Sequence, residues 1–350
     1  MKAAVMEEIR KPLAVREMPD PKIFPGGAVV RVEANGICRS DWHAWVGDWS
    51  WFGLKLNFPH VLGHEFCGVV EEVGEGVARV RRGQRVLVPF SQGEGHCDYC
   101  RAGQQHLCDM RVTPGIAYWG GFGRLVGVPF ADVNLVPLPD SIGFTEAASM
   151  GCRYMTSFHA LVDRAQVRAG EWVAVHGCGG IGLSAVQIAT ALGANVIGVD
   201  ITDDKLALAK SVGAVATVNA RTNNAVKAIA DLTGGGAHVS VDALGVAATC
   251  QASVMSLRKQ GRHLQIGLTS SAEKGMVPIP IDLLVLKEAS LIGSYGMPAP
   301  RFDAMLQMVQ SGKLAPGKLV SRTVPLEEAG SVLASMDSFA TVGVTVIDRY

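Results

Sequence analysis

The sequence lacks the features that direct a chain to a membrane, to export or to nucleic acid. It has no run of about 18 apolar residues, the length that a membrane-spanning helix requires. Its start, MKAAVMEEIR, contains no uninterrupted apolar stretch of the secretory kind. Its 32 basic residues balance its 32 acidic ones, so no excess charge favours nucleic acid or an anionic membrane surface. We therefore expect a cytoplasmic protein without nucleic-acid or membrane partners.

The chain also has no internal repeat, low-complexity tract or long linker. Its 350 residues, 48% of them hydrophobic, exceed what one typical core accommodates and predict two domains. Residues 1–150 are predicted to be mostly β, because short apolar runs alternate with glycine, proline and charged turn signals. From about 297 we expect one helix, RFDAMLQMVQSG, and a final β-like run, TVGVTVID.

Between 171 and about 296, short apolar runs alternate with amphipathic helical stretches. The predicted strands are EWVAVHG, NVIGVD, AHVSVDAL and RHLQIGL. The predicted helices are IGLSAVQIATALG, DDKLALAKSVG and the stretches 222–233 and 247–259. Alternation of this kind indicates right-handed βαβ units and a parallel sheet, and hence the α/β fold class.

A glycine-rich turn, HGCGGIG, joins the first strand of this region to its first helix. Its glycines are Gly177, Gly179, Gly180 and Gly182. Gly177 allows a tight turn, Gly179 lets the backbone approach a pyrophosphate, and Gly182 lets the helix pack closely on the strand. Asp200, at the end of the next strand, suits both ribose hydroxyls of NAD and would repel the 2′-phosphate of NADP, and Lys205 could reach the same ribose. The alternative is an ordinary strand–helix turn followed by an aspartate that caps a helix.

The eight cysteines indicate metal binding, since a long chain without a secretory signal is not expected to need a disulfide scaffold. The cluster CDYCRAGQQHLC contains Cys97, Cys100 and Cys108. Its C-x2-C-x7-C spacing is typical of a closed structural zinc site. Cys38, His64 and Cys152 are far apart in sequence, and spacing alone leaves ordinary core packing open for them. Together they would form a Cys2His set whose open fourth position lets zinc polarise an alcohol.

The order of GICRSDWH, GHE, the cysteine cluster, MGC and GCGGIG resembles the zinc-dependent alcohol dehydrogenases of the medium-chain dehydrogenase/reductase superfamily, over essentially the whole chain. The resemblance implies a GroES-like catalytic domain over 1–153 and 297–350, with a metal lobe at about 91–110. It implies a Rossmann domain with a doubly wound parallel sheet over 154–296, and an active site in the cleft between the domains. The implied cofactors are NAD and zinc, with one catalytic and one structural ion per subunit.

By the same resemblance, Cys38, His64 and Cys152 hold the catalytic zinc. Glu65 sits next to the metal, as a supporting residue or an exchangeable ligand. Asp41 is similar to the carboxylate that orients the ligand imidazole in this family.

Ser40 and His43 match the proton relay of the family, which carries the alcohol proton to solvent while the alkoxide carbon gives its hydride to nicotinamide. A second interpretation of Ser40 and Asp41, compatible with the first, is the N-cap of a helix. Arg39 could contact the pyrophosphate, or it could equally be a surface charge.

The metal lobe departs from the family pattern at one position. The family usually has a fourth cysteine three residues before the first of the cluster, and here that position is Glu94. A carboxylate can ligate zinc, so Glu94 with the three cysteines is the predicted set. His96 is the rival ligand, although its adjacency to Cys97 makes a tetrahedral arrangement awkward. A metal-free lobe with three reduced thiols is the remaining alternative.

Five of the six tryptophans lie near these motifs. The aromatic residues concerned are Trp42, Trp45, Trp49, Trp51, Phe52, Tyr118 and Trp119. They would form an apolar pocket for bulky or aromatic alcohols, or they would serve core packing or a subunit interface. The resemblance further implies a homo-oligomer, and the chain length suggests a tetramer that associates through its nucleotide domains.

Three other functions compete with an alcohol dehydrogenase. A relative acting on polyols, threonine or another functionalised alcohol differs only in its pocket, which sequence does not fix. A zinc-free quinone or enoyl reductase would lack both metal sets, which are present here. A zinc-stabilised module that binds nucleic acid would need a basic surface, which the neutral charge does not provide.

Overall fold

The computed structural model of the chain describes residues 1–339 and 341–350. Its internal contacts divide it into two compact units. Unit 1 comprises Met1–Met155, Gly296–Gly312 and Pro316–Tyr350, and unit 2 comprises Thr156–Tyr295 and Lys313–Ala315. Within the described residues, none of the helices combines the length and the apolar character that crossing a bilayer would demand.

Unit 2 contains a six-stranded sheet whose strand pairs are all parallel. In spatial order its strands are β11 (Ala216–Asn219), β10 (Asn195–Asp200), β9 (Trp172–His176), β12 (Ala237–Asp242), β13 (Leu257–Gln265) and β14 (Ser290–Gly293). The chain builds outward from β9 in one direction and then returns to β12 on its other side, so the strand order reverses between β9 and β12. In doubly wound sheets, ligands bind at the carboxyl ends of the strands at this reversal.

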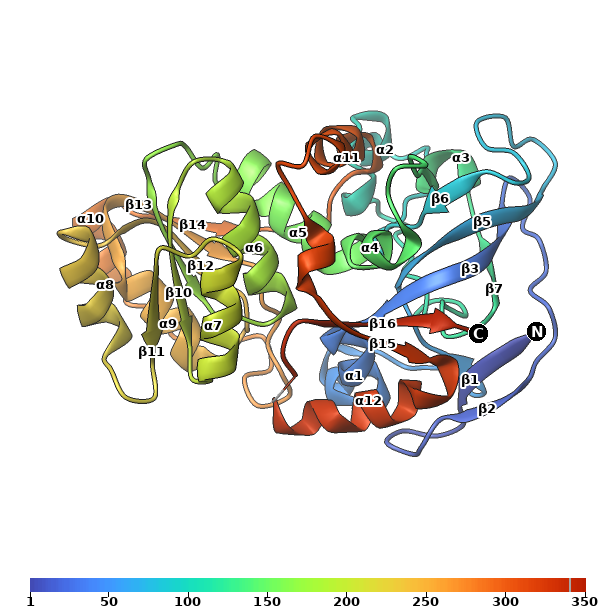
Figure 1. Cartoon of the computed structure of the whole chain (residues 1–350), viewed down its shortest axis with the longest axis horizontal. Coiled ribbons are helices and arrows are strands. Elements are labelled where there is room, and N and C mark those ends of the chain that lie inside the picture. Colours follow the sequence, from blue (N-terminus) through green and yellow to red (C-terminus); the bar gives the residue numbers. More distant parts are fainter. Residues whose placement is uncertain (340) are drawn as a thin grey trace. The chain divides into compact units, whose positions relative to one another are not determined.

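Helices connect these strands and pack on the sheet (Figure 1). They are α6 (Gly180–Ala191), α7 (Asp203–Ser211), α8 (Ala225–Thr233), α9 (Ala247–Met255) and α10 (Ile281–Lys287). The predicted α/β class and parallel sheet are confirmed. One detail was wrong: the helix expected over 247–259 ends at Met255, because β13 already begins at Leu257. The segment Lys313–Ala315 joins unit 2 because the Gln187 side chain bonds the backbone N–H and C=O of Ala315.

Unit 1 is mostly β, as the sequence predicts, and contains two sheets. The smaller has the order β2 (Ala14–Glu17), β1 (Lys2–Met6) and β4 (His60–Val61). The larger has the order β15 (Val320–Pro325), β16 (Val344–Arg349), β3 (Ala28–Ile37), β5 (Glu65–Val73), β6 (Arg85–Leu87) and β8 (Val136–Pro137), with β7 (Leu125–Val128) paired to β3. The register pairs Gly36 at the end of β3 with Glu65 at the start of β5. The residues that follow β3 and precede β5 are therefore neighbours.

Short helices fill the connections of unit 1. They are α1 (Arg39–Val46), α2 (Asp98–Arg101), α3 (Ala131–Asn134), α4 (Phe144–Ala148), α5 (Met155–Phe158, which runs into unit 2), α11 (Phe302–Gln310) and α12 (Ala329–Ser335). The expectation of a single helix after 297 was wrong, because α12 follows α11. The seven residues of α12 give the 3.6-residue period little room to show itself in the sequence.

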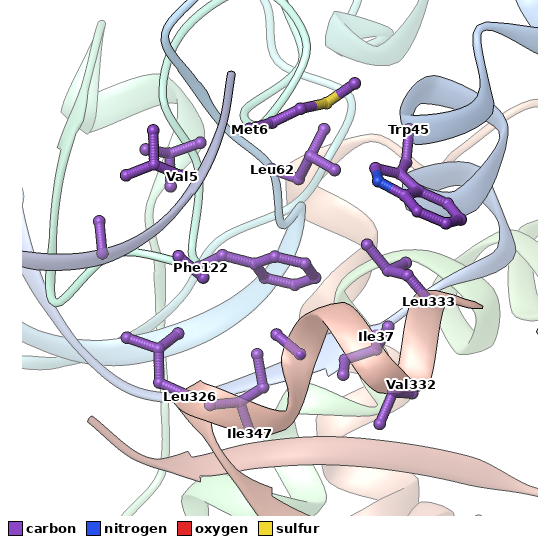
Figure 2. Close-up of a cluster of buried hydrophobic side chains, with 14 of the residues drawn as sticks. Val5, Met6, Ile37, Trp45, Leu62, Phe122, Leu326, Val332, Leu333 and Ile347 are labelled. Carbon is purple, nitrogen blue, oxygen red and sulfur yellow. The ribbon is translucent and has the colours of Figure 1, made fainter. Parts of the chain in front are cut away.

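One core of unit 1 packs α1 and α12 against the strand residues between them (Figure 2). Trp45 from α1, Leu333 from α12 and Phe122 from a loop converge there, and each is buried. Burying side chains of this size stabilises the unit by about 2 kcal/mol each. The core therefore fixes α1, the helix whose N-cap is Cys38.

Candidate active site and metal sites

Four buried side chains converge in unit 1: Cys38, His64, Glu65 and Cys152. Their ligand atoms, one from each residue, all lie within 4.8 Å of one another. Cys38 follows β3, while His64 and Glu65 lie at the start of β5, so the register of the two strands brings them together. Cys152 lies in a π-helical turn, Met150–Tyr154, whose Gly151 carbonyl accepts the Phe90 backbone N–H. Isolated π-helical turns occur frequently at functional sites.

Asp41 ties two of these segments together. As the third residue of α1, it accepts the Cys38 backbone N–H at 2.9 Å through Oδ2 and so caps the helix. Its other oxygen accepts the Gly63 N–H at 3.1 Å and contacts His64 Nδ1 at 2.8 Å. Cys38, rather than the expected Ser40, is the N-cap residue, and Ser40 is the second residue of the helix.

The fit of this cluster to a metal ion can be tested on the imidazole of His64. Its Nδ1 is bonded to Asp41, while its Nε2 is buried without a hydrogen-bond partner among the described residues. A buried polar atom without a partner is costly unless a ligand satisfies it. Two thiols and such a nitrogen are the donors that zinc prefers, so the residues fit the metal.

Within the cluster, neighbouring groups shift the pKa values of the two thiols and of the imidazole. A hydrogen bond from Cys152 holds the pKa of Cys38 well below its ordinary value and raises that of Cys152. Burial lowers the pKa of His64, but the negative charges of Asp41 and Cys38 outweigh burial and raise it overall. A bound cation would replace the shared proton of the two thiols.

Arg153, which sequence reasoning missed, is paired with Glu65. The Glu65 Oε1 accepts the Arg153 Nε–H at 2.9 Å and its backbone N–H at 3.1 Å, and Oε2 contacts Nη2. Burial raises the pKa of Glu65, and the charge of Arg153 opposes that rise. Because 88 residues separate Arg153 from Glu65, the sequence does not indicate that they pair. The one signal available was the presence of a basic residue directly after Cys152.

His43 is enclosed by α1 and the segment that follows it. Its Nδ1 contacts Asp48 Oδ2 at 2.6 Å, and its ring stacks on Trp49 with 4.8 Å between centroids and 10° between planes. Burial lowers the pKa of His43, and Asp48 partly offsets this. Asp48 was also missed in the sequence, because nothing in the spacing pairs it with the histidine.

Arg39, predicted to contact a pyrophosphate or to be a surface charge, is half-buried within unit 1. Its guanidinium carbon lies 3.5 Å from the ring centroid of Trp42 and 3.9 Å from that of Phe339, and Nη1 donates to the Met336 carbonyl. Burial lowers its pKa to about 10.

The second cluster is formed by Glu94, Cys97, Cys100 and Cys108, whose ligand atoms also lie within 4.8 Å of one another. Glu94 Oε1 accepts the Cys97 backbone N–H at 2.6 Å and lies 4.0 Å from the Cys108 sulfur. His96, the rival ligand, is exposed and is not among the four residues that gather. Three thiols and one carboxylate form a complete tetrahedral donor set.

The glycine turn of unit 2 lies at the carboxyl end of β9, where the strand order reverses. Gly177 has a φ of +91°, and a Cβ on Gly182 would come within 1.8 Å of the Gly177 carbonyl oxygen. Gly179 is the N-cap of α6, and a Cβ on it would meet nothing within 4 Å. Gly180 is the first residue of that helix.

Asp200 ends β10 and faces the glycine turn. Its Oδ2 accepts the Cys178 N–H at 2.8 Å, and its Oδ1 accepts the N–H groups of Ile201 and Thr202. The N-cap of α7 is Thr202, so the alternative of Asp200 as a helix cap was wrong. Lys205 is buried on α7.

The aromatic residues divide between core and surface. Trp45 belongs to the core in Figure 2, with Trp42 and Trp119 packed against it. Tyr118 is bonded to Gln92. Trp51 and Phe52 are 36% and 52% exposed; Phe52 contacts Trp49, which stacks on His43, and Trp51 contacts Phe52. Some of the aromatic residues predicted to line a substrate pocket, Trp45 among them, therefore pack in the core of unit 1.

A cluster of two thiols and an imidazole is typical of a zinc site. A glycine turn at the reversal of a parallel sheet is typical of a nucleotide site. Dehydrogenases that depend on a metal and a nucleotide have both. Two family models match the chain: the alcohol dehydrogenase GroES-like domain over residues 25–140, and zinc-binding dehydrogenase over residues 180–311. The chain belongs to the zinc-dependent alcohol dehydrogenases of the medium-chain dehydrogenase/reductase superfamily. The resemblance seen in the sequence is thereby confirmed.

Relatives match along nearly the whole chain. It is 38% identical over 337 residues to an alcohol dehydrogenase of Geobacillus stearothermophilus, covering 96% of each chain. It is 34% identical to an NAD-dependent alcohol dehydrogenase of Sulfurisphaera tokodaii, covering 99% of each. The structure matches the alcohol dehydrogenase TADH from Thermus sp. ATN1 with a TM-score of 0.91 at 32% identity, covering all of both chains.

Proposed function

We propose that this enzyme oxidises alcohols to aldehydes or ketones with NAD, and catalyses the reverse reduction, with zinc held by Cys38, His64 and Cys152. The observation that carries the proposal is that His64 Nε2 lies buried beside the thiols of Cys38 and Cys152 and meets no nitrogen or oxygen partner among the described residues. When bound, zinc supplies Lewis acidity toward the alcohol oxygen, and NAD accepts the hydride.

The side chains around the cluster orient ligands and move a proton. Asp41 fixes the orientation of the His64 ring through Nδ1, so that Nε2 is the ring nitrogen left to bind the metal. Ser40, on the first turn of α1, receives the alcohol proton, and His43 carries it onward. Asp48 holds His43 through Nδ1, which leaves Nε2 to accept the proton. The lowered pKa of His43 keeps this ring neutral and able to accept a proton near pH 7.

NAD rather than NADP is the proposed cofactor, bound at the glycine turn with Gly177, Gly179, Gly180 and Gly182. Asp200, next to that turn, and Lys205 are the proposed ribose contacts. The Asp200 carboxylate already accepts three backbone N–H groups, which orient it. A fixed negative charge at this position disfavours the 2′-phosphate of NADP. Arg39 remains a proposed pyrophosphate contact, although its observed partners are Trp42 and Met336.

A second, structural zinc is proposed for Glu94, Cys97, Cys100 and Cys108. The carboxylate supports this assignment, because it lies with the three thiols while His96 does not. The wild-type chain should then bind two zinc ions per subunit, and Glu94→Ala should bind fewer. Equal zinc content in the two proteins, measured by elemental analysis, would remove Glu94 as a ligand.

The substrate proposed is a bulky or aromatic alcohol. Trp49, Trp51 and Phe52 support this, because they form a continuous series of ring contacts that begins at His43. We further propose that the enzyme acts in the cytoplasm as a homotetramer. Eight free cysteines support a reducing compartment, and exposed apolar side chains of unit 2, among them Ile281, Val285 and Leu286, support association through that unit.

The proposal is tested by incubating the zinc-loaded protein with ethanol, medium-chain and benzylic alcohols, and with NAD or NADP. We expect NADH formation, with a higher kcat/KM for the bulkier alcohols and a strong preference for NAD. Cys152→Ser, in which a ligand is lost, serves as the inactive control. No NADH with any alcohol, despite full zinc loading, would contradict the proposal and favour a metal-stabilised binding module.

A further inference from the structure

The Glu65 carboxylate lies among the metal-binding atoms, yet its oxygens are bonded to an arginine. It is within 4.8 Å of the donors of Cys38, His64 and Cys152. Oε1 accepts two N–H groups of Arg153, at 2.9 and 3.1 Å, and Oε2 accepts from Nη2. Both oxygens that could reach a metal are thus engaged by one cation.

The second cluster contains a carboxylate that no arginine holds. Glu94 completes a set of four donors with three thiols, and among the described residues it forms no ion pair. Four protein ligands make a closed structural site, while a catalytic site keeps three ligands and one open position. Glu65 has the same donor chemistry and the same proximity to thiols. The two carboxylates differ in their partners: Arg153 holds Glu65, while Glu94 accepts the backbone N–H of Cys97.

We infer that Arg153 is a positioning residue that holds the Glu65 carboxylate away from the metal and so keeps the fourth coordination position open for the alcohol. This inference rests on the proposed role of Cys38, His64 and Cys152. Arg153 directly follows Cys152, so the π-helical turn Met150–Tyr154 carries both a metal ligand and the residue that keeps the fourth position open.

The surroundings hold the ion pair in place. Glu65 is fully buried and Arg153 is 6% exposed, so water does not compete for either charge. A Cβ on Gly36 would come within 2.4 Å of Glu65 Oε2 and 2.9 Å of Arg153 Nη2, so glycine provides the space for the pair. Arginine suits this role because its planar guanidinium grips both carboxylate oxygens. Without it, the buried carboxylate would lose its counter-charge, and the metal would take that place.

The test uses the full-length protein with cobalt in place of zinc, and imidazole as a small probe of the open position. Imidazole shifts the visible spectrum of cobalt only where a coordination position is available. The second cluster has four protein donors, so it should give no response. Wild type, Arg153→Met, Glu65→Gln and the double variant are titrated in the absence of alcohol and NAD.

We expect wild type and Glu65→Gln to respond alike, and Arg153→Met to require roughly tenfold more imidazole or not to respond. The double variant should regain the response, because glutamine carries no charge to bring to the metal. A wild-type response in Arg153→Met, or no recovery in the double variant, would overturn the inference. If Arg153→Met does not fold, Arg153→Lys replaces it, because it keeps the charge but grips one oxygen. An unchanged response in Arg153→Lys would equally overturn the inference.

The same titration separates this inference from the proposed function. Thiolate-to-cobalt absorption that is unaffected by Cys38→Ser would mean that the Cys38 set binds no metal, and the proposed catalytic site would fail. Normal absorption with an unaltered imidazole response in Arg153→Met would remove the role of Arg153 alone.

Discussion

Neighbouring groups determine what three histidines of this chain, His43, His64 and His176, can do. Asp41 fixes the His64 ring through Nδ1 and leaves Nε2 as the nitrogen that can bind a metal. Asp48 holds His43 in the same way. His176, at the end of β9, is buried with its Nε2 unpartnered among the described residues, and burial lowers its pKa. The three rings share one chemistry but differ in charge and in role because of these neighbours.

Replacing Asp48 by asparagine should shift the acid limb of the pH–rate profile. Burial lowers the pKa of His43, Asp48 and Cys38 oppose this, and Arg39 adds to it. Removing the Asp48 charge lowers that pKa further, so the neutral ring persists to lower pH. We expect kcat to fall and the acid limb of kcat/KM to move down by about one pH unit. Asp337→Asn, a nearby carboxylate bonded to Trp42, is the matched control, and equal shifts in both variants would contradict the assignment.

Replacing His176 by leucine should make stability less sensitive to acid. Burial, with a smaller contribution from His263, lowers the pKa of His176 from 6.5 to about 3. Below pH 6.5 the unfolded chain binds a proton that the folded chain refuses, so stability falls as the pH drops toward 3. The variant should therefore gain on the order of 2 kcal/mol relative to wild type between pH 7 and about pH 5. Urea unfolding at both pH values measures this difference, and parallel losses in both proteins would refute it.

At the scale of elements, the turn that precedes α6 contains glycine for two different reasons. Gly182 has no room for a Cβ, because the Gly177 carbonyl lies 1.8 Å from that position. Gly179 has open space on the side where a Cβ would point. Gly182 is therefore required by the fold, while Gly179 is expected to matter for the pyrophosphate.

The variants Gly179→Ala and Gly182→Ala form a matched pair. Gly182→Ala should lose about 1–3 kcal/mol of stability from overpacking. Gly179→Ala should unfold like wild type but show a raised KM for NAD. Thermal unfolding and NAD titration separate the two effects. A wild-type KM in Gly179→Ala, or unchanged stability in Gly182→Ala, would contradict this division.

Sequence patterns predicted α6, α7, β9 and β10 close to their observed bounds, because short apolar strands alternate there with amphipathic helices. Other elements were not predicted: β11, β14, α10 and α12. Each is short, and α10 has no buried residue, so the period that marks a packed face is missing.

At the site, spacing alone indicated only the three clustered cysteines, while the family resemblance named Cys38, His64, Glu65 and Cys152 and drew attention to Glu94. Neither could find Arg153 or Asp48, since a positioning contact depends on where the chain returns in space. Neither could separate a core tryptophan from a pocket tryptophan. Trp45 faces the core in Figure 2, while Trp51 in the next segment is 36% exposed.

At the scale of the whole molecule, unit 2 exposes large apolar side chains on its edge strand β14, on α10 and in the segment before α10, which we call its apolar surface. Its large side chains are Met276 (79% exposed), Ile281 (63%), Val285 (69%), Leu286 (80%) and Leu291 (47%). An edge strand with exposed apolar neighbours is a surface for association between copies. This surface supports the proposed homo-oligomer.

Replacing Leu286 by glutamate should weaken that association. A charge at the centre of an apolar interface is left unpaired and desolvated, so subunits should separate at higher concentration than in wild type. Leu232→Glu, on α8 and 45% exposed, is the control. Sedimentation velocity should show smaller species for Leu286→Glu only. Identical profiles for all three proteins would exclude this surface as the interface.

The central claim is that Cys38, His64 and Cys152 together hold one zinc ion. Anomalous X-ray diffraction measured at the zinc absorption edge, on crystals grown with zinc, tests it most directly. We predict an anomalous peak bonded to the two Sγ atoms and to His64 Nε2, with Glu65 still on Arg153. Ordered side chains at these three positions with no peak between them, while zinc occupies the Glu94 cluster, would contradict the account.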